Sequence, residues 1–573
     1  MPKIEVHEKL FNTLLGATYS HAELEAILPV AKAELDGYDE EERLYKFELN
    51  DTNRPDLWSG AGLARQLSSY RDKTIPQYDF FSTAQETLDS EGRRLIVHKS
   101  AQEVRPYSIG FAAEGKVIDE EILLNLIQSQ EKLCHNFGQK RKTIAIGVYR
   151  SDLIEYPVHF EGVDPDKAHF VPLHMSEDLT LRQICEKHPK GIEYGPIVAD
   201  KPLFPLLYEN RGAVLSFPPV INSAHVGAVE VGDERLFFEL SGTILDDLLL
   251  AASILACDCA DMGYKILPVL CEYEFDTPYG REITVPYYYQ EPAACDLSFL
   301  RKTLGEELTN DAIVLALRKM GVFAITDEHK VYITIPEFRN DFLHPVDIVE
   351  DVMIGHGLNN FEVEMPSEST VGRLSAAEIF SRKVKDIMVG LSYQEMIYNY
   401  LGSKKEYIDN MLVSGESYIQ IANPMSENYE FVRPSIIPSL LESESVSAHA
   451  PYPHSIFEIG KVAFKDEDEV SGTTTRNYLG FLSAGSDADF NQLNSELASL
   501  FYFLKCEYTM EALKDPRFIE GRCGSLVTNG TIIGIFGEVH PAVLEEWGIT
   551  VPTVACEIDL DLVRTKGLQK RPQ

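Results

Sequence analysis

The sequence predicts an α+β multidomain protein with two small α/β repeat domains, an α/β domain inserted between them, and a C-terminal module built on an antiparallel sheet. The chain has 573 residues, enough for roughly four domains of ordinary size. Two distant segments each contain a helix-capping residue, then a strand with alternating apolar residues, then an Arg-x-Asp motif. The same order in both indicates a repeat. In the last third of the chain the expected strands outnumber the helices, which favours an antiparallel sheet.

The first small domain is expected over residues 1–85. Ser20 can cap a helix that begins at His21, with Glu23 three residues further on as its capping-box partner. Residues 45–49 alternate between apolar and polar side chains, which predicts a strand. The segment Asn53–Leu57 contains a proline and an aspartate that are typical of a turn into a helix.

The inserted domain is expected over residues 86–275. An amphipathic helix is predicted over residues 119–137, followed by the basic loop Lys140-Arg141-Lys142 and a buried strand over residues 144–148. Residues 246–262 predict a long helix, which Gly263 ends.

The second small domain is expected over residues 283–363. Thr309 can cap a helix that ends at Gly321, and residues 331–335 alternate as a strand. Arg339-Asn340-Asp341 then matches Arg54-Pro55-Asp56. The match is loose, so chance similarity remains the alternative to a true repeat.

The last module is expected over residues 370–573. Helices are predicted at 376–390 and 491–504. The expected strands share an apolar alternation and lie at residues 393–400, 455–462, 477–483, 524–528 and 532–539.

Composition restricts the class of protein. The N-terminus is charged and the most apolar run, Leu248–Cys257, is too short to span a membrane, so we expect no membrane association and a cytoplasmic location. Nine cysteines without a CxxC pair predict reduced thiols. The net charge of −38 argues against nucleic acid as a partner, unless the phosphate-facing charge lies mostly on another subunit.

One cluster of acidic residues has the spacing of a metal site. Asp347, Glu350 and Asp351 stand at i, i+3 and i+4, so a helix places them on one face, and Asp341 lies just upstream. Converging carboxylates suit magnesium or calcium. The alternative is that acidic residues in a first helical turn stabilise the helix dipole without any ligand.

A second set of polar residues indicates a cleft in the inserted domain. Ser216, Glu239, Ser241 and Thr243 lie at predicted strand ends beside the rigid turn Phe217-Pro218-Pro219, where ligand groups commonly gather. The alternative is that the hydroxyls only satisfy the turn at Gly242.

Seven segments, in order along the chain, resemble the β subunit of phenylalanyl-tRNA synthetases. They are Asn53–Leu57, Arg105–Tyr107, Lys140–Gly147, Phe170–Leu173, Leu215–Asn222, Ser241–Thr243 and Asp347–Asp351. The length is similar to that of the archaeal and eukaryotic type, because bacterial-type β subunits are longer.

The resemblance implies a subunit of an (αβ)2 heterotetramer that joins phenylalanine to tRNA(Phe) with ATP, the active site lying on the α subunit. The C-terminal module would then be a degenerate class II synthetase core. Its segment Ser455–Gly460 lacks the arginine that would bind ATP phosphates, and the segment around 534–540 lacks another. Adenylate formation is therefore not expected on this chain.

The resemblance also implies two sites. Asp341, Asp347, Glu350 and Asp351 match the family's magnesium site. Leu207, Ser216, Glu239 and Ser241 match the cleft of the family's editing domain, which hydrolyses mischarged tyrosyl-tRNA. Some members are expected to have Asp and Thr where this chain has Glu239 and Ser241. The alternatives are a stand-alone aminoacyl-tRNA deacylase and a non-catalytic binding paralogue.

Overall fold

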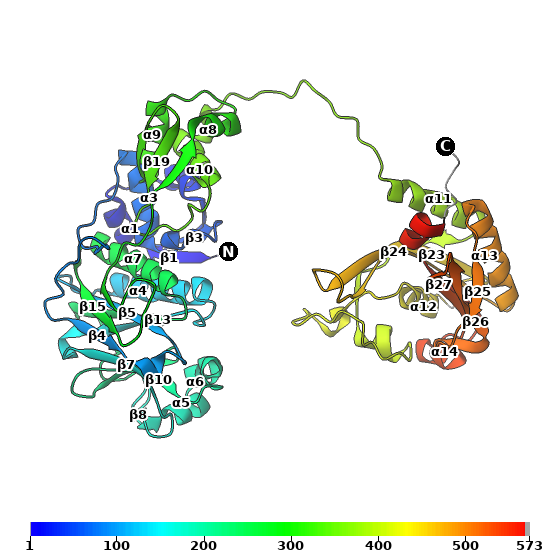
Figure 1. Cartoon of the computed structure of the whole chain (residues 1–573), viewed down its shortest axis with the longest axis horizontal. Helices are drawn as coiled ribbons and strands as arrows, with labels where there is room; N and C mark the ends of the chain where they lie inside the picture. Colours follow the sequence, from blue (N-terminus) through cyan, green and yellow to red (C-terminus); the bar gives the residue numbers. More distant parts are fainter. Residues whose placement is uncertain (1, 448, 568–573) are drawn as a thin grey trace. The chain divides into compact units, whose positions relative to one another are not determined.

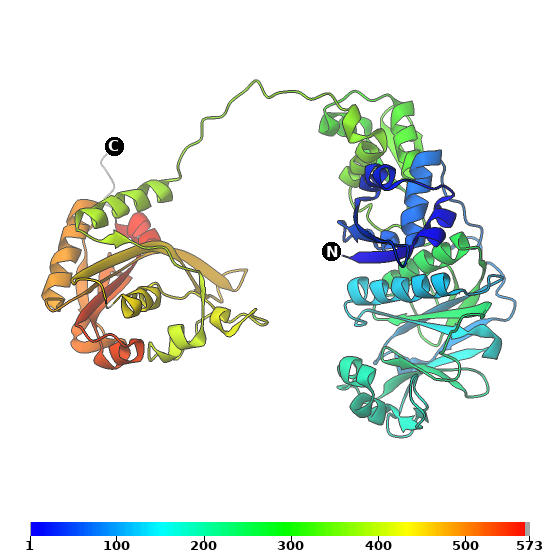
Figure 2. The same ribbon diagram turned by 180° about the vertical axis from the view of Figure 1, so that it is seen from behind.

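The computed structural model describes residues 2–447 and 449–567 (Figures 1 and 2). Its contacts divide the chain into two compact units, Met1–Met365 and Pro366–Gln573. Residues 362–374 between them are exposed and contain no helix or strand. The α+β class with several sheets is confirmed.

The first unit contains two small domains with one element order, β-α-α-β-β-α. The first copy consists of β1 (Lys3–His7), α1 (Glu8–Leu15), α2 (His21–Ile27), β2 (Ala33–Asp39), β3 (Leu44–Leu49) and α3 (Gly60–Asp72). The second copy consists of β17 (Ala293–Asp296), α8 (Leu297–Leu304), α9 (Asn310–Lys319), β18 (Phe323–Thr326), β19 (Lys330–Thr334) and α10 (Pro345–His356).

Both copies have the same sheet. The strand orders are β1-β3-β2 and β17-β19-β18, and every pair is antiparallel. Local caps form as their sequences predict: Ser20 and Glu23 make a capping box, and the Thr309 hydroxyl accepts the N–H of Ala312. The shared topology makes chance similarity of the two segments an inadequate explanation.

The inserted domain consists of two packed sheets and two long helices. The seven-stranded sheet has the order β12-β11-β10-β7-β4-β15-β16 and the four-stranded sheet the order β14-β5-β13-β6. Their strands are β4 (Arg94–Val97), β5 (Tyr107–Glu114), β6 (Ile144–Arg150), β7 (Val158–Val163), β10 (Phe204–Tyr208), β11 (Val214–Phe217), β12 (Ile221–Asn222), β13 (Arg235–Gly242), β14 (Lys265–Leu267), β15 (Val269–Tyr273) and β16 (Glu282–Val285). The two-residue strands β8 (His169–Phe170) and β9 (Leu179–Thr180) form a separate pair.

The long helix α7 (Leu245–Asp261) packs on the four-stranded sheet on one side and contacts α3 on the other, so it is buried almost all round (Figure 1). Helix α4 (Glu120–Lys132) ends earlier than the sequence predicts, because a π-helix, η4 (Leu133–Phe137), follows it. The remaining helices here are α5 (Leu181–Lys187) and α6 (Pro189–Tyr194).

The second unit is built on one seven-stranded sheet of order β20-β23-β24-β28-β27-β26-β25, antiparallel except for β20 beside β23. Its strands are β20 (Gln394–Glu395), β23 (His454–Lys465), β24 (Thr473–Ala484), β25 (Thr509–Ala512), β26 (Phe518–Thr528), β27 (Thr531–Val539) and β28 (Thr553–Asp559), with β21 (Leu401–Gly402) and β22 (Phe431–Val432) forming a small separate pair. The strand expected over 393–400 is reduced to β20, and sequence patterns missed β25 and β28.

Helices cover both faces of this sheet (Figure 2). Helices α11 (Ala376–Gly390) and α13 (Phe490–Leu504) share one apolar core with Leu479 and Phe481 of β24, while α12 (Ile437–Val446) shares another with Leu482. Successive residues of a strand point to opposite faces, so β24 contributes to both cores. The short helices α14 (Pro541–Trp547) and α15 (Leu560–Leu562) complete the unit. No helix in the described part of the chain is both long and apolar enough to cross a membrane.

Candidate functional sites

The acidic residues expected to bind magnesium lie at the start of α10 and in the turn before it. Arg339, which the sequence analysis treated only as part of the repeat, lies between two of them. Its Nε is 3.0 Å from Asp341 Oδ1, and its Nη1 is 2.5 Å from Asp351 Oδ2. The guanidinium is fully buried, and its planar fork suits two carboxylates.

The other two carboxylates have different partners. Asp347 accepts the backbone N–H groups of Leu343 and His344 at 2.8 and 2.6 Å, which caps α10. Glu350 is paired with Lys32 of the first small domain at 2.9 Å. The four carboxylates therefore do not converge on one point.

This geometry does not fit a magnesium site. Within residues 2–447 and 449–567, no group of three or more His, Cys, Asp or Glu side chains could hold a metal ion. The positive charges of Arg339 and Arg54 lower the pKa of Asp341 despite its burial, whereas burial raises the pKa of Asp351. Arginine supplies the charge that a cation would bring, and the magnesium set remains a prediction without geometric support.

The same arrangement occurs in the first small domain. Arg54 binds Asp56, two residues on, at 2.8 Å, and Gln66, twelve residues on, at 3.2 Å. Arg339 likewise binds Asp341, two residues on, and Asp351, twelve residues on. Arg54 Nε also lies 3.8 Å from Asp341 Oδ1, so the two copies meet at these buried charges.

The polar residues of the inserted domain form a cleft between its two sheets. Ser216 lies on β11 of the seven-stranded sheet and Glu239 on β13 of the four-stranded sheet, and both line one small cavity of about 20 Å³. Ser241 is two residues from Glu239 on the same strand and is buried. Leu207 is paired with Ser216 across β10 and β11 but lies in the apolar core rather than on the cavity.

Glu239 is a buried acid with an altered pKa. Burial raises its pKa to about 7, although a hydrogen bond from Ser108 Oγ, 2.7 Å from Glu239 Oε1, and the nearby charge of Arg105 oppose the shift. A carboxyl group with a pKa near neutrality can accept or give a proton under physiological conditions.

Arg105 holds this cleft together. The buried guanidinium donates from Nε to Ser241 Oγ at 3.1 Å and from Nη1 to the carbonyl of Lys142 at 3.2 Å. Burial lowers its pKa to about 10, so it keeps its positive charge near Glu239 at neutral pH.

Tyr149 fixes the other side of the cleft. Its hydroxyl donates to Ser216 Oγ over 2.8 Å, and the ring is fully buried. The ring lies back across Gly147, where an added Cβ would come within 2.0 Å of the tyrosine oxygen. Arg105 and Gly147 lie in two of the segments that resemble the family, but the sequence predicted no role for them, for Ser108 or for Tyr149, because these contacts join residues far apart in the chain.

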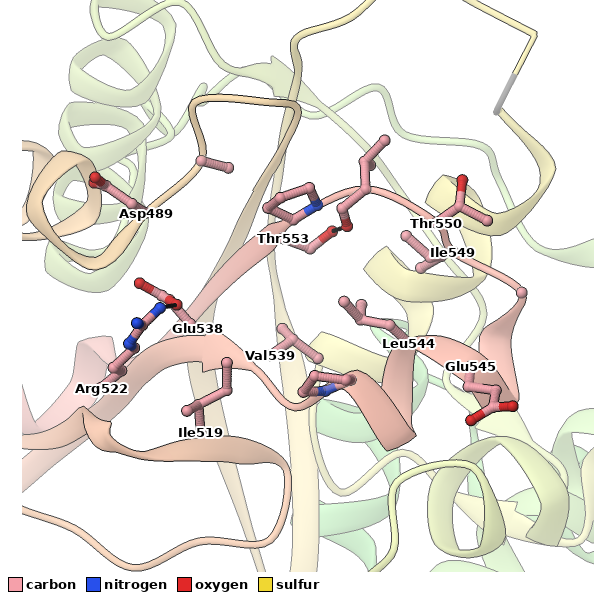
Figure 3. A pocket seen from close by; sticks show the side chains of 15 residues that line it. Asp489, Ile519, Arg522, Glu538, Val539, Leu544, Glu545, Ile549, Thr550 and Thr553 are labelled. Atoms are coloured by element: carbon pink, nitrogen blue, oxygen red, sulfur yellow. Dashed lines mark hydrogen bonds and ion pairs between the residues drawn. The ribbon is translucent and has the colours of Figure 1, made fainter.

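The second unit contains a cavity of about 640 Å³ beside α14 (Figure 3). Its walls are partly apolar, with Ile519, Val539 and Leu544, and its one arginine, Arg522, binds Glu538 at 2.7 Å. No residue expected to act in a site lines it. We assign it no chemistry.

A buried arginine of this unit is bound by the unit's own residues. Arg433 is fully buried, binds Glu458 at 2.6 Å and lies over the ring of Tyr400. Helix α12 packs directly on β24, where a Cβ on Gly480 would come within 2.6 Å of Ile436. Helix α12 thus occupies part of this face of the sheet.

Comparison with known proteins gives the family. Residues 362–560 match the model described as phenylalanyl tRNA synthetase beta chain CLM domain, and residues 293–358 match the tRNA synthetase B5 domain. A phenylalanine–tRNA ligase beta subunit from Borrelia garinii subsp. bavariensis is 46% identical over 98% of this chain and 99% of its own length. The corresponding protein of Borreliella burgdorferi is 46% identical over 99% of this chain and 100% of its own.

A solved structure supports the same relationship. An N-terminal fragment of the phenylalanyl-tRNA synthetase β-subunit from Pyrococcus horikoshii is 34% identical, with a TM-score of 0.57, covering 62% of this chain and 100% of the fragment. The full-length relatives named above are bacterial, so they do not support the archaeal and eukaryotic type that the length suggested. With nearly complete coverage at this level of identity, the chain belongs to the family of phenylalanine–tRNA ligase beta subunits.

Proposed function

We propose that this chain is the β subunit of a heterotetrameric (αβ)2 ligase that uses ATP to attach phenylalanine to tRNA(Phe) in the cytoplasm. The observation that carries the proposal is the full-length likeness to phenylalanine–tRNA ligase beta subunits. The proposal includes four domains, at residues 1–85, 86–275, 283–363 and 370–573. The last of them serves as a scaffold that is similar to a class II synthetase core.

The chemistry of ATP belongs to the α subunit in this proposal. Helix α12 covers one face of the sheet in the second unit, and Arg433 is engaged by Glu458. A site for adenylate formation needs free guanidinium groups placed to stabilise phosphate charge. We therefore assign the binding of ATP and magnesium to the holoenzyme.

Hydrolysis of mischarged tRNA is the activity proposed for the inserted domain. A hydrophobic amino-acid pocket rejects one added hydroxyl only weakly, so a second site that removes tyrosine improves accuracy. Glu239, with its pKa of about 7, would act as the general base that takes a proton from the attacking water. Ser216 and Ser241, fixed by Tyr149 and Arg105, would orient the ester by hydrogen bonds.

Two measurements test these proposals. The chain is expressed with and without a candidate α subunit, and the mass, charging and adenylate formation of each preparation are measured; we expect charging only from the complex. Adenylate made by this chain alone would overturn the subunit assignment.

Deacylation is tested separately with tyrosyl-tRNA(Phe). Glu239→Gln keeps the size of the side chain and removes the base, so we expect loss of deacylation and more net mischarging with tyrosine. Glu161→Gln, on β7 of the same domain, is the matched control. Equal deacylation by the unaltered chain and the Glu239→Gln variant would remove the assignment.

A further inference from the structure

Residues 138–142, here called the basic loop, connect the π-helix η4 to β6. The loop places Lys140, Arg141 and Lys142 in succession in a chain with 52 basic and 90 acidic residues. Both lysines are exposed, and neither has a carboxylate within ion-pair distance in the described part of the chain. Cations that no acid neutralises attract anions more strongly than paired ones.

The backbone of the basic loop is held in an unfavourable conformation. Gln139, Lys140 and Arg141 have φ angles of 49°, 56° and 67°, a region that costs about 1–2 kcal/mol per residue for an L-amino acid. Three such residues in a row persist only because their surroundings impose them, and conformations of this kind cluster at functional sites.

Arg105 imposes the conformation and joins it to the cleft. Its guanidinium donates to the carbonyls of Arg141 and Lys142 at 3.3 and 3.2 Å, and the same group donates to Ser241 Oγ. The N–H of Lys140 is bound by the carbonyl of His135 at 2.9 Å. The loop and the cleft are therefore linked through one guanidinium.

Arg141 connects the basic loop to the cleft. Its Nη1 donates to the carbonyls of Pro219 and Val220 at 3.2 and 3.1 Å, and its guanidinium lies 4.3 Å from the centre of the Tyr194 ring. Arg141 lines both the cavity that contains Glu239 and a neighbouring cavity of about 210 Å³. Lys140 and Lys142 are the neighbours of Arg141 in the chain, and both are exposed.

We propose that the basic loop binds the phosphates of the unpaired 3′ end of an aminoacyl-tRNA, with Lys140 and Lys142 as the phosphate contacts. The inference rests on the proposed hydrolysis and adds the part of the substrate that positions the ester. The esterified amino acid is carried at the end of a flexible polyanion, which must be held near Glu239 for the ester to enter. Phosphate contacts fix the register of such a strand without reading its sequence.

The test uses the full chain and a double variant, Lys140→Gln/Lys142→Gln, which removes two charges and leaves Arg141 in place. The matched control is Lys116→Gln/Lys265→Gln. Both lysines are exposed and lie near the other end of β5. Lys116 follows that strand in the chain, and Lys265 of β14 is the cross-strand neighbour of Glu114. Ser108 at the cleft is six residues from Glu114 along that strand, about 20 Å away.

The measurement is deacylation of tyrosyl-tRNA(Phe) at several salt concentrations. We expect KM for the loop variant to rise about tenfold at low salt with kcat unchanged, and the slope of log(1/KM) against log[salt] to fall by about 1.4, or 0.7 for each single-strand phosphate contact. The control should keep the KM and slope of the unaltered chain.

Two outcomes separate this inference from the proposed function. If the unaltered chain deacylates and the loop variant has the same KM and slope, docking at the basic loop is wrong while hydrolysis stands. If the unaltered chain does not deacylate, the proposed hydrolysis fails. Fluorescence anisotropy with uncharged tRNA then decides the loop: weaker, less salt-dependent binding in the loop variant supports it, and equal binding overturns it.

Discussion

Arg339 binds Asp351 through two hydrogen bonds, with Nη1 to Oδ2 at 2.5 Å and Nη2 to Oδ1 at 3.1 Å, and both side chains are buried. The same guanidinium holds Asp341, and the equivalent Arg54 of the first small domain approaches that aspartate. The second small domain is thus joined to the first by buried charge.

Replacing Arg339 with methionine should destabilise the first unit strongly. The substitution leaves two buried carboxylates without their partner, and breaking a buried ion pair in this way costs about 3–5 kcal/mol. Urea unfolding followed by circular dichroism measures the change. The control is Arg318→Met on α9, an exposed arginine, which we expect to change stability by about 0.5 kcal/mol or less. A similar loss in both variants would contradict the structural role of Arg339.

Magnesium should not stabilise the chain. Asp341 and Asp351 share Arg339, and Glu350 is held by Lys32, so a cation would have to displace these partners. A ligand present at 100 times its Kd would raise the free energy of unfolding by about 2.7 kcal/mol. We expect no such rise in thermal unfolding at millimolar magnesium and constant ionic strength. A rise that Asp347→Asn abolishes would restore the magnesium site.

Stability should decrease with pH across the titration of Glu239. The folded-state pKa, about 7, is above the ordinary value of 4.5, so between these values the folded chain retains a proton that the unfolded chain has lost. The free energy of unfolding is therefore highest below about pH 4.5 and falls until about pH 7, by up to about 3 kcal/mol from this group alone.

Glu239→Gln removes this dependence. We expect its stability curve to lack that part of the decline and to lie above the unaltered chain at about pH 8. Urea midpoints over the pH range, with Glu161→Gln as the control, provide the comparison. Parallel curves for the Glu239→Gln variant and the unaltered chain would show that Glu239 titrates normally.

The connection between the two units should be the first site of proteolysis. Residues 362–374 are all exposed and contain Arg373 and several glutamates, which suit trypsin and a glutamate-specific protease. Among residues 2–447 and 449–567, each apolar core is made of residues from one unit alone. We therefore expect two stable fragments on a gel, each with its own cooperative thermal transition. Fragments that are degraded as fast as they appear would show that one unit needs the other.

Local features of the fold could be predicted because neighbouring residues decide them. Helix α11 has the predicted bounds, the Ser20–Glu23 capping box forms, and Gly263 follows the end of α7 with a φ of 96°. Caps and apolar periodicity act over a few residues, so they can be recognised in any segment taken alone. The seven segments that resemble the family could likewise be recognised from the order of residues alone.

The partners of the site residues were decided by the tertiary structure. Helical spacing correctly placed Asp347, Glu350 and Asp351 near one another, but Lys32, 318 residues before Glu350, determines what that carboxylate binds. The hydrogen bond from Tyr149 to Ser216 spans 67 residues, and that from Arg105 to Ser241 spans 136. By itself the sequence determined which groups were present and where several helices, such as α2, α9 and α11, begin. Only folding decided which charges meet, because burial and distance set the strength of each pair and depend on segments remote along the chain.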